Sequence, residues 1–124
     1  MGVAAASPAA AAGPNKKKVQ GGTVSGNFFF SSGLTGTRPK AGDIKEQTHN
    51  IMKAHKANLE ALGSSLDNVL KVTAFLADVK GEKPAFNEAY AEYFKKDAPS
   101  RTALGALFPD NETRVEIELV AWIP

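Results

Sequence analysis

Two segments near the carboxyl end of the chain decide its fold: Ala98–Leu107 (APSRTALGAL) and Val115–Ile123 (VEIELVAWI). Both are typical of β-strands, and a polar turn separates them. Arg101 stands at the start of an otherwise uncharged strand of small residues, and the carboxylate of Glu116 lies near the start of the next strand. A buried guanidinium without an anion is costly. Arg101 therefore either forms an ion pair with Glu116 or Glu118 that ties the two strands together, or it binds an acidic ligand.

The composition narrows the class of protein. At 124 residues the chain is long enough for one domain with a core of its own. It contains no cysteine, which excludes a disulfide scaffold and a cysteine nucleophile and is typical of a reducing compartment. We expect the cytoplasm or, alternatively, the mitochondrion. Two histidines argue against a zinc site, and a net charge of +2 is too small to indicate nucleic-acid binding. No apolar run approaches the roughly 18 residues that span a membrane.

Residues 1–16 differ in composition from the rest of the chain. They are rich in alanine, contain proline and glycine, and show no apolar periodicity. Such a segment cannot bury enough apolar surface to fold. We expect residues 1–16 to be a disordered N-terminal tail and residues 17–124 to form a single domain.

Beyond the tail, the sequence pattern predicts an α+β domain with two helices. Asp43 is the expected N-cap of the first helix, and Gly63 is a plausible residue just past its end. The remaining helix is expected to open at Pro84. The expected elements are, in order, a strand from Lys18, a turn at Ser25–Asn27, a strand at Phe28–Ser31, the first helix, a strand at Leu70–Ala77, the second helix and the two terminal strands.

Three polar residues fall on the apolar stripes of these helices. His55 is one of them, and we expect it to be a hydrogen-bonded core residue rather than a catalytic base. Tyr90 and Tyr93, on the inner face of the second helix, are expected to be core or boundary residues.

Two helices cover only one face of such a sheet, so the other face needs a partner. It carries apolar groups drawn from Phe28–Phe30, Leu70–Leu76 and Val115–Ile123. Left in water, this face would exceed the patch of a few hundred Å² that monomers usually expose. We expect another subunit to cover it, and we expect a charge on it, such as Ile117→Asp, to dissociate or unfold the assembly.

Four short motifs occur in the same order as in a known family, and together they extend from about Lys18 to Trp122. They are Val19–Gly22 (VQGG) leading through Gly26–Gly33 (GNFFFSSG), Phe86–Tyr90 (FNEAY) leading to Phe94, Pro99–Thr102 (PSRT) and Val115–Glu118 (VEIE). In this respect the chain resembles the Rid family, the reactive intermediate deaminases, also called the YjgF or L-PSP endoribonuclease family.

The resemblance implies a chorismate-mutase-like fold, in which a mixed β-sheet carries two helices on one face and three subunits form a central barrel. It implies a homotrimer with three clefts between subunits. In the family, a cleft arginine grips the carboxylate of a 2-imino or 2-enamino acid, and water attacks the imine carbon to give a 2-oxo acid and ammonia. No metal or organic cofactor is needed, because an iminium carbon is already electrophilic. Nucleic acid and membranes are not expected partners.

Carried over by motif, Arg101 is the carboxylate clamp and Glu116 positions or deprotonates the water. The resemblance implies that the substrate-binding residues are Ser32, Gly33, Asn87, Lys18 and Ala103. Lys18 stands where deaminating members often have tyrosine, and Ala103 stands where many have cysteine and use the backbone carbonyl.

Three functions are compatible with these residues. The first is hydrolytic deamination of reactive imino and enamino acids. The second is non-catalytic binding, by a trimer, of a small carboxylate or a protein. The third is the ribonuclease or translation-inhibitor activity attached to several names in the family, although the sequence lacks an aromatic platform interleaved with a basic groove.

Overall fold

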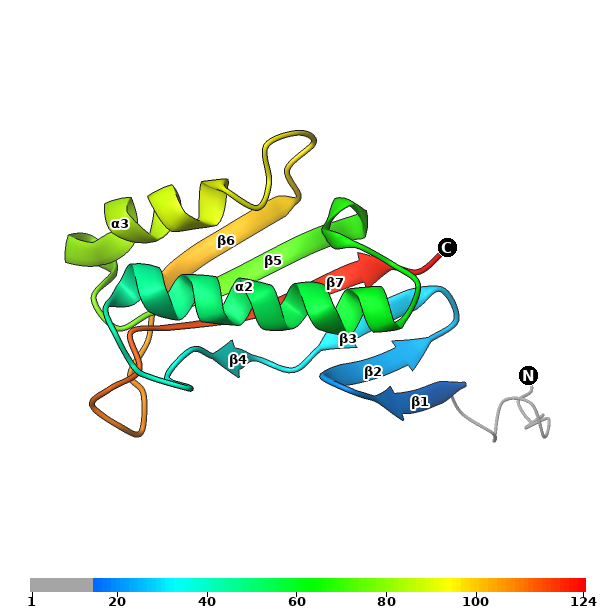
Figure 1. The fold of residues 1–124 in the computed structure, drawn as a ribbon, viewed down its shortest axis with the longest axis horizontal. Coiled ribbons are helices and arrows are strands. Elements are labelled where there is room, and N and C mark those ends of the chain that lie inside the picture. Colours follow the sequence, from blue (N-terminus) through cyan, green and yellow to red (C-terminus); the bar gives the residue numbers. More distant parts are fainter. Residues whose placement is uncertain (1–14) are drawn as a thin grey trace, which may run out of the picture.

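The computed structural model describes residues 15–124, and these form one mixed sheet with two α-helices packed on one of its faces (Figure 1). The α+β fold expected from the sequence is confirmed. The expected tail lies largely outside the described residues, and the first strand begins at Lys16. The elements are β1 (Lys16–Val19), β2 (Gly22–Ser25), β3 (Phe28–Ser31), β4 (Leu34–Thr35), α2 (Ile44–Ala61), a 3₁₀ turn η1 (Leu66–Asn68), β5 (Val69–Leu76), α3 (Val79–Ala91), β6 (Ser100–Gly105) and β7 (Val115–Trp122).

The strand order is β1-β2-β3-β7-β5-β6, and the short β4 pairs with β7 beyond the end of β3. Strands β5 and β6 run parallel, whereas the other pairs are antiparallel. A parallel pair needs a crossover, and α3 provides it. The chain therefore places β1 and β6 at opposite edges of the sheet, with the long strand β7 near its centre.

Local signals explain both ends of α2. The carboxylate of Asp43 accepts a hydrogen bond from the Glu46 backbone N–H at 2.9 Å, which confirms it as the N-cap. After the helix, Gly63 adopts a positive φ of 77°, and its N–H donates to the Glu60 carbonyl at 3.0 Å. This conformation suits glycine, so the expected end of the helix is confirmed as well.

The expected start of the second helix is wrong. Helix α3 begins at Val79, and Pro84 lies inside it. The physical reason is the N-cap at Asp78, whose carboxylate accepts from the Gly81 N–H at 3.0 Å and satisfies a donor of the first turn. Pro84 then costs the helix one backbone hydrogen bond, which the packing of its apolar face offsets.

The core lies between the sheet and the two helices. His55 is fully buried on α2, and its Nε2–H donates to the Ile117 carbonyl at 2.9 Å, so it is a core histidine as expected. Burial lowers the pKa of His55. Ile117 is also fully buried beneath the helices. Its expected position on the uncovered face is therefore wrong, because side chains alternate along β7 and Ile117 lies on the core side.

The face of the sheet turned away from both helices, here called the outer face, carries the other set of side chains. Large apolar groups on it remain exposed in the single chain. Phe28 lies opposite Trp122 across the β3–β7 pair, and Phe30 lies opposite Val120. Phe28, Phe30 and Trp122 are 44%, 47% and 42% exposed. Three neighbouring aromatic groups in water are what an interaction surface presents.

Candidate functional site

Arg101 lies on β6 and points to the helix-covered side of the sheet. It is the register partner of the buried Val72 on β5, and it is half-buried itself. Its guanidinium carbon lies 4.9 Å from the ring centroid of Tyr90 and 5.4 Å from that of Phe86, both on α3. Among residues 15–124, no carboxylate forms an ion pair with it. The guanidinium therefore packs on two aromatic rings, without an anion from the described part of its chain.

Glu116 lies on the opposite side of the sheet from Arg101. In β7 it is the register partner of Phe75 and Thr35, and it is half-buried. The strand order also places β5 between β6 and β7. The ion pair considered as one role for Arg101, with Glu116 or Glu118, is therefore absent from the described chain, because strand order and side-chain alternation keep the charges apart.

Four of the five expected substrate-binding residues fall into two groups, one on the side of Glu116 and one on the side of Arg101. Gly33 lies against Glu116, since a Cβ at position 33 would overlap the Glu116 Oε2 atom. The adjacent Ser32 is exposed, and its backbone N–H donates to the Gly21 carbonyl at 2.8 Å. Ser32, Gly33 and Glu116 thus form one group, in the segment that joins β3 to β4 and on the neighbouring part of β7.

The second group lies on β6, which holds Arg101, and on α3, whose rings contact it. Ala103 is two residues further along β6, on the same face, and packs against the core. Asn87 follows Phe86 on α3, and its Oδ1 atom is buried without a hydrogen-bond partner in the described chain. The Tyr90 hydroxyl is also buried without a partner. Burial raises the pKa of Tyr90 to about 12, although the Arg101 charge opposes this. Tyr90 therefore keeps its proton at neutral pH.

Lys18 belongs to neither group. It is exposed on β1, at the edge of the sheet opposite to β6 (Figure 1). The structure therefore places Arg101 near Ala103 and the helix that carries Asn87, and it places Glu116 near Ser32 and Gly33. Within the described chain these two groups remain apart.

Comparisons with known proteins agree with this fold. The family model described as Endoribonuclease L-PSP matches residues 7–123. The chain belongs to the Endoribonuclease L-PSP family. This is the Rid or YjgF family that the sequence motifs resemble.

Relatives in the Endoribonuclease L-PSP family carry several names. A RutC family protein of Pyrococcus horikoshii is 40% identical over 102 residues, which are 78% of this chain and 80% of that protein. Reactive Intermediate Deaminase A, chloroplastic, of Arabidopsis thaliana is 31% identical over 117 residues, 90% of this chain and 60% of that protein. The crystal structure of yeast Mmf1 superposes with a TM-score of 0.77 at 30% identity, over 84% of this chain and 86% of the Mmf1 chain.

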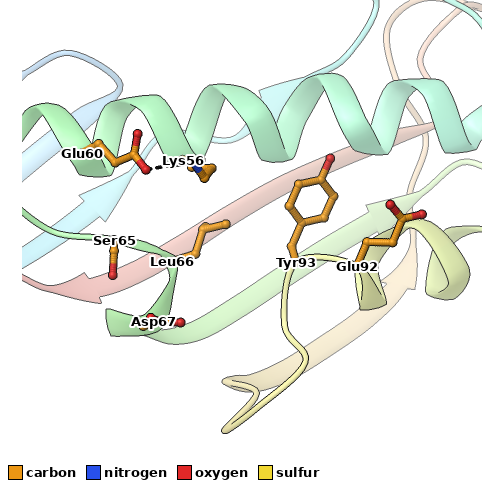
Figure 2. A pocket seen from close by; sticks show the side chains of 7 residues that line it. All are labelled: Lys56, Glu60, Ser65, Leu66, Asp67, Glu92 and Tyr93. Atoms are coloured by element: carbon orange, nitrogen blue, oxygen red, sulfur yellow. Dashed lines mark hydrogen bonds and ion pairs between the residues drawn. The ribbon is translucent and has the colours of Figure 1, made fainter.

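A groove in the described part of this family member is lined by none of the seven expected site residues. Figure 2 shows the side chains that line it. It measures about 370 Å³ and is lined by Lys56, Glu60, Ser65, Leu66, Asp67, Glu92 and Tyr93. Lys56 and Glu60 pair with each other along α2 at 2.8 Å, and the Tyr93 hydroxyl lies 2.7 Å from the His49 Nδ1 atom. The groove is therefore a polar hollow between α2, η1 and the end of α3, separate from Arg101.

The described residues hold neither a metal-binding cluster nor a membrane-spanning helix. Among residues 15–124, no group of three or more histidine, aspartate or glutamate side chains is arranged to hold a metal ion. None of the described helices has the length and apolarity required to cross a bilayer.

The contact between Arg101 and the rings of Phe86 and Tyr90 was missed from the sequence. Sequence reasoning placed Tyr90 in the core or at its boundary without a link to the arginine. The available signal was the spacing of four residues between the two aromatic groups, which places both on one face of a helix that follows β5 and precedes β6.

Proposed function

We propose that this chain forms a homotrimer that hydrolyses reactive 2-imino acids, and their 2-enamino tautomers, to 2-oxo acids and ammonia. The observation that carries the proposal is Arg101, a half-buried cation with no anionic partner among residues 15–124. A guanidinium with free donors binds a carboxylate through two parallel hydrogen bonds. Family membership and the relative named Reactive Intermediate Deaminase A support the reaction class.

The reaction balances with water as the only co-reactant. Arg101 holds the substrate carboxylate and thereby places the imine carbon. Glu116 accepts a proton from water while the water oxygen bonds to that carbon. That proton passes to nitrogen, which gives a carbinolamine. The hydroxyl proton of the carbinolamine then also passes to nitrogen as the carbon–nitrogen bond breaks, so ammonia leaves and the carbonyl forms. The site contributes orientation and proton transfer, which suffice for a carbon that is already electrophilic.

The separation of Arg101 from Glu116 within one chain implies a shared cleft. The two side chains lie on opposite faces and on strands separated by β5. A site that uses both must therefore take Arg101 from one subunit and Glu116, with Ser32 and Gly33, from the next. The exposed aromatic groups of the outer face support an assembly in which subunits meet.

Turnover with an imine generated in situ by an amino-acid oxidase tests the reaction. Arg101→Ala should remove acceleration of 2-oxo acid and ammonia release, and Arg101→Lys should restore little of it, since one ammonium cannot replace the fork of donors. Glu116→Gln should lower kcat more than it weakens binding. Melting temperatures should change little in all three variants. Full activity of the Arg101→Ala protein would contradict the proposal.

A mixture of two inactive variants tests the shared cleft. Subunits with Arg101→Ala and subunits with Glu116→Gln are refolded together in equal amounts. If each cleft draws the two residues from different subunits, about a quarter of the clefts regain both, and about a quarter of the activity returns. If both residues came from one chain, the mixture would stay inactive.

The other two functions predict different outcomes. A binding protein would bind a small carboxylate such as pyruvate in an Arg101-dependent manner without accelerating imine hydrolysis. A ribonuclease would cleave RNA in an Arg101-dependent manner when free of contaminating nuclease. The compartment, cytoplasm or mitochondrion, remains part of the proposal; one yeast relative is named mitochondrial and the Arabidopsis relative chloroplastic.

A further inference from the structure

The aromatic surface beneath Arg101 belongs to a continuous row of rings along α3 and the segment after it. The ring centroids of Phe86 and Tyr90 are 5.5 Å apart, and those of Tyr90 and Phe94 are 5.0 Å apart. Phe86 is fully buried and Tyr90 is 7% exposed. Rings packed in this way have little freedom, so they give the guanidinium a rigid support.

The manner in which the rings hold the arginine leaves its donors available. An aromatic face attracts a cation through its quadrupole, whereas a carboxylate would occupy the in-plane N–H groups. No side-chain or backbone acceptor in residues 15–124 forms a hydrogen bond with the Arg101 guanidinium. The Tyr90 hydroxyl has no partner either, so the ring and not the hydroxyl makes the contact.

We propose that Phe86 and Tyr90 are positioning residues that hold the Arg101 guanidinium against their ring faces, so that its hydrogen-bond donors stay free and aimed for an anionic ligand. This inference rests on the proposed function, since it explains how the arginine that binds the substrate carboxylate is held in position. It predicts that the ring at position 90 matters for ligand binding and that the hydroxyl does not.

Two substitutions at one position separate these contributions, and a neighbouring ring supplies the control. Tyr90→Phe keeps the ring and should leave the KM for the imino acid within about two-fold of wild type. Tyr90→Leu removes the ring and should raise KM about five-fold, with a smaller effect on kcat. Phe94→Leu removes a ring that packs on Tyr90 but makes no cation–π contact with Arg101. It should destabilise the fold and leave KM unchanged.

The motion of Arg101 provides a measurement that needs no turnover. In ¹⁵N relaxation of arginine Nε–H groups, Arg101 of the ligand-free protein should be far more rigid than the exposed Arg38. Tyr90→Leu should release it, and Tyr90→Phe and Phe94→Leu should not. If Arg101 is as mobile as Arg38 in the wild type, the positioning role is refuted whatever the enzyme does.

The two proposals can fail separately. If Arg101 is rigid and Tyr90→Leu frees it, but the wild type shows no turnover, the deaminase function fails and the dissociation constant of pyruvate replaces KM as the readout. A five-fold weaker binding of pyruvate by Tyr90→Leu alone then supports the positioning role. Equal KM or equal pyruvate affinity in Tyr90→Leu and Phe94→Leu would overturn it.

Discussion

A charge placed at Phe30, on the outer face of the sheet, should dissociate the assembly and leave the subunit folded. Phe30 is 47% exposed in the single chain, pairs with Val120 across β7, and belongs to the exposed aromatic group of that face. Its exposed half does not support the subunit core. Phe30→Asp should therefore perturb the proposed contact between subunits more than the fold of each one.

The size of the effect follows from the area. A phenylalanine side chain presents roughly 200 Å², so the exposed 47% corresponds to about 90 Å². At about 25 cal/mol per Å², covering it contributes about 2 kcal/mol per subunit. An unpaired carboxylate in the same interface costs several kcal/mol more. Because about 1.4 kcal/mol is tenfold in an equilibrium constant, the dissociation constant should rise by at least about 30-fold.

Sedimentation velocity at about 10 μM, together with thermal melting by circular dichroism, measures both parts of this prediction. Wild type should sediment as a trimer and Phe30→Asp as a folded monomer. Ala54→Asp, an equal change at an exposed position of α2, should remain trimeric. Ile117→Asp should unfold, because Ile117 is buried in the core of the subunit. A wild type that is monomeric at this concentration, or a Phe30→Asp protein as fully assembled as wild type, would refute the reasoning.

Three further predictions concern single side chains. Because the pKa of His55 is lowered in the folded protein, the unfolded chain binds a proton there at higher pH, so the free energy of unfolding falls as the pH drops below about 6.5, by up to about 1.4 kcal/mol per pH unit. Urea titrations at several pH values should show a weaker pH dependence of the free energy of unfolding in His55→Gln, and an identical dependence in both proteins would contradict this role of His55. Gly33→Ala should displace the Glu116 carboxylate and lower kcat by about 10- to 100-fold at an unchanged melting temperature; unaltered turnover would place Glu116 outside the mechanism. Tyr93→Phe removes the hydrogen bond to His49 that ties α2 to the end of α3, and should lower the free energy of unfolding by about 1 kcal/mol in urea denaturation; no loss would mean that water replaces the bond fully.

Several features of this protein are readable from the sequence because they depend on neighbouring residues. The cap at Asp43 and the glycine at Gly63 delimit α2 through contacts within one helical turn. The apolar stripe that contains His55 places it in the core, since helical periodicity alone decides which face it occupies. The family motifs likewise identify the fold, because their order can be read along the chain without knowing which residues are in contact.

Other features were decided by the tertiary structure, because they depend on strand order and on which side of a strand a residue lies. The alternation along β7 contains the signal that Ile117 and Glu116 face opposite ways, but only the helices packed on one side show which of them is the core face. Placing β5 between β6 and β7 separates Arg101 from Glu116, and no local pattern encodes that neighbour relation. The contact between Arg101 and the Tyr90 ring also depends on the tertiary structure. Arg101 lies on a strand and Tyr90 on a helix, and the two meet only when the crossover helix packs against the sheet.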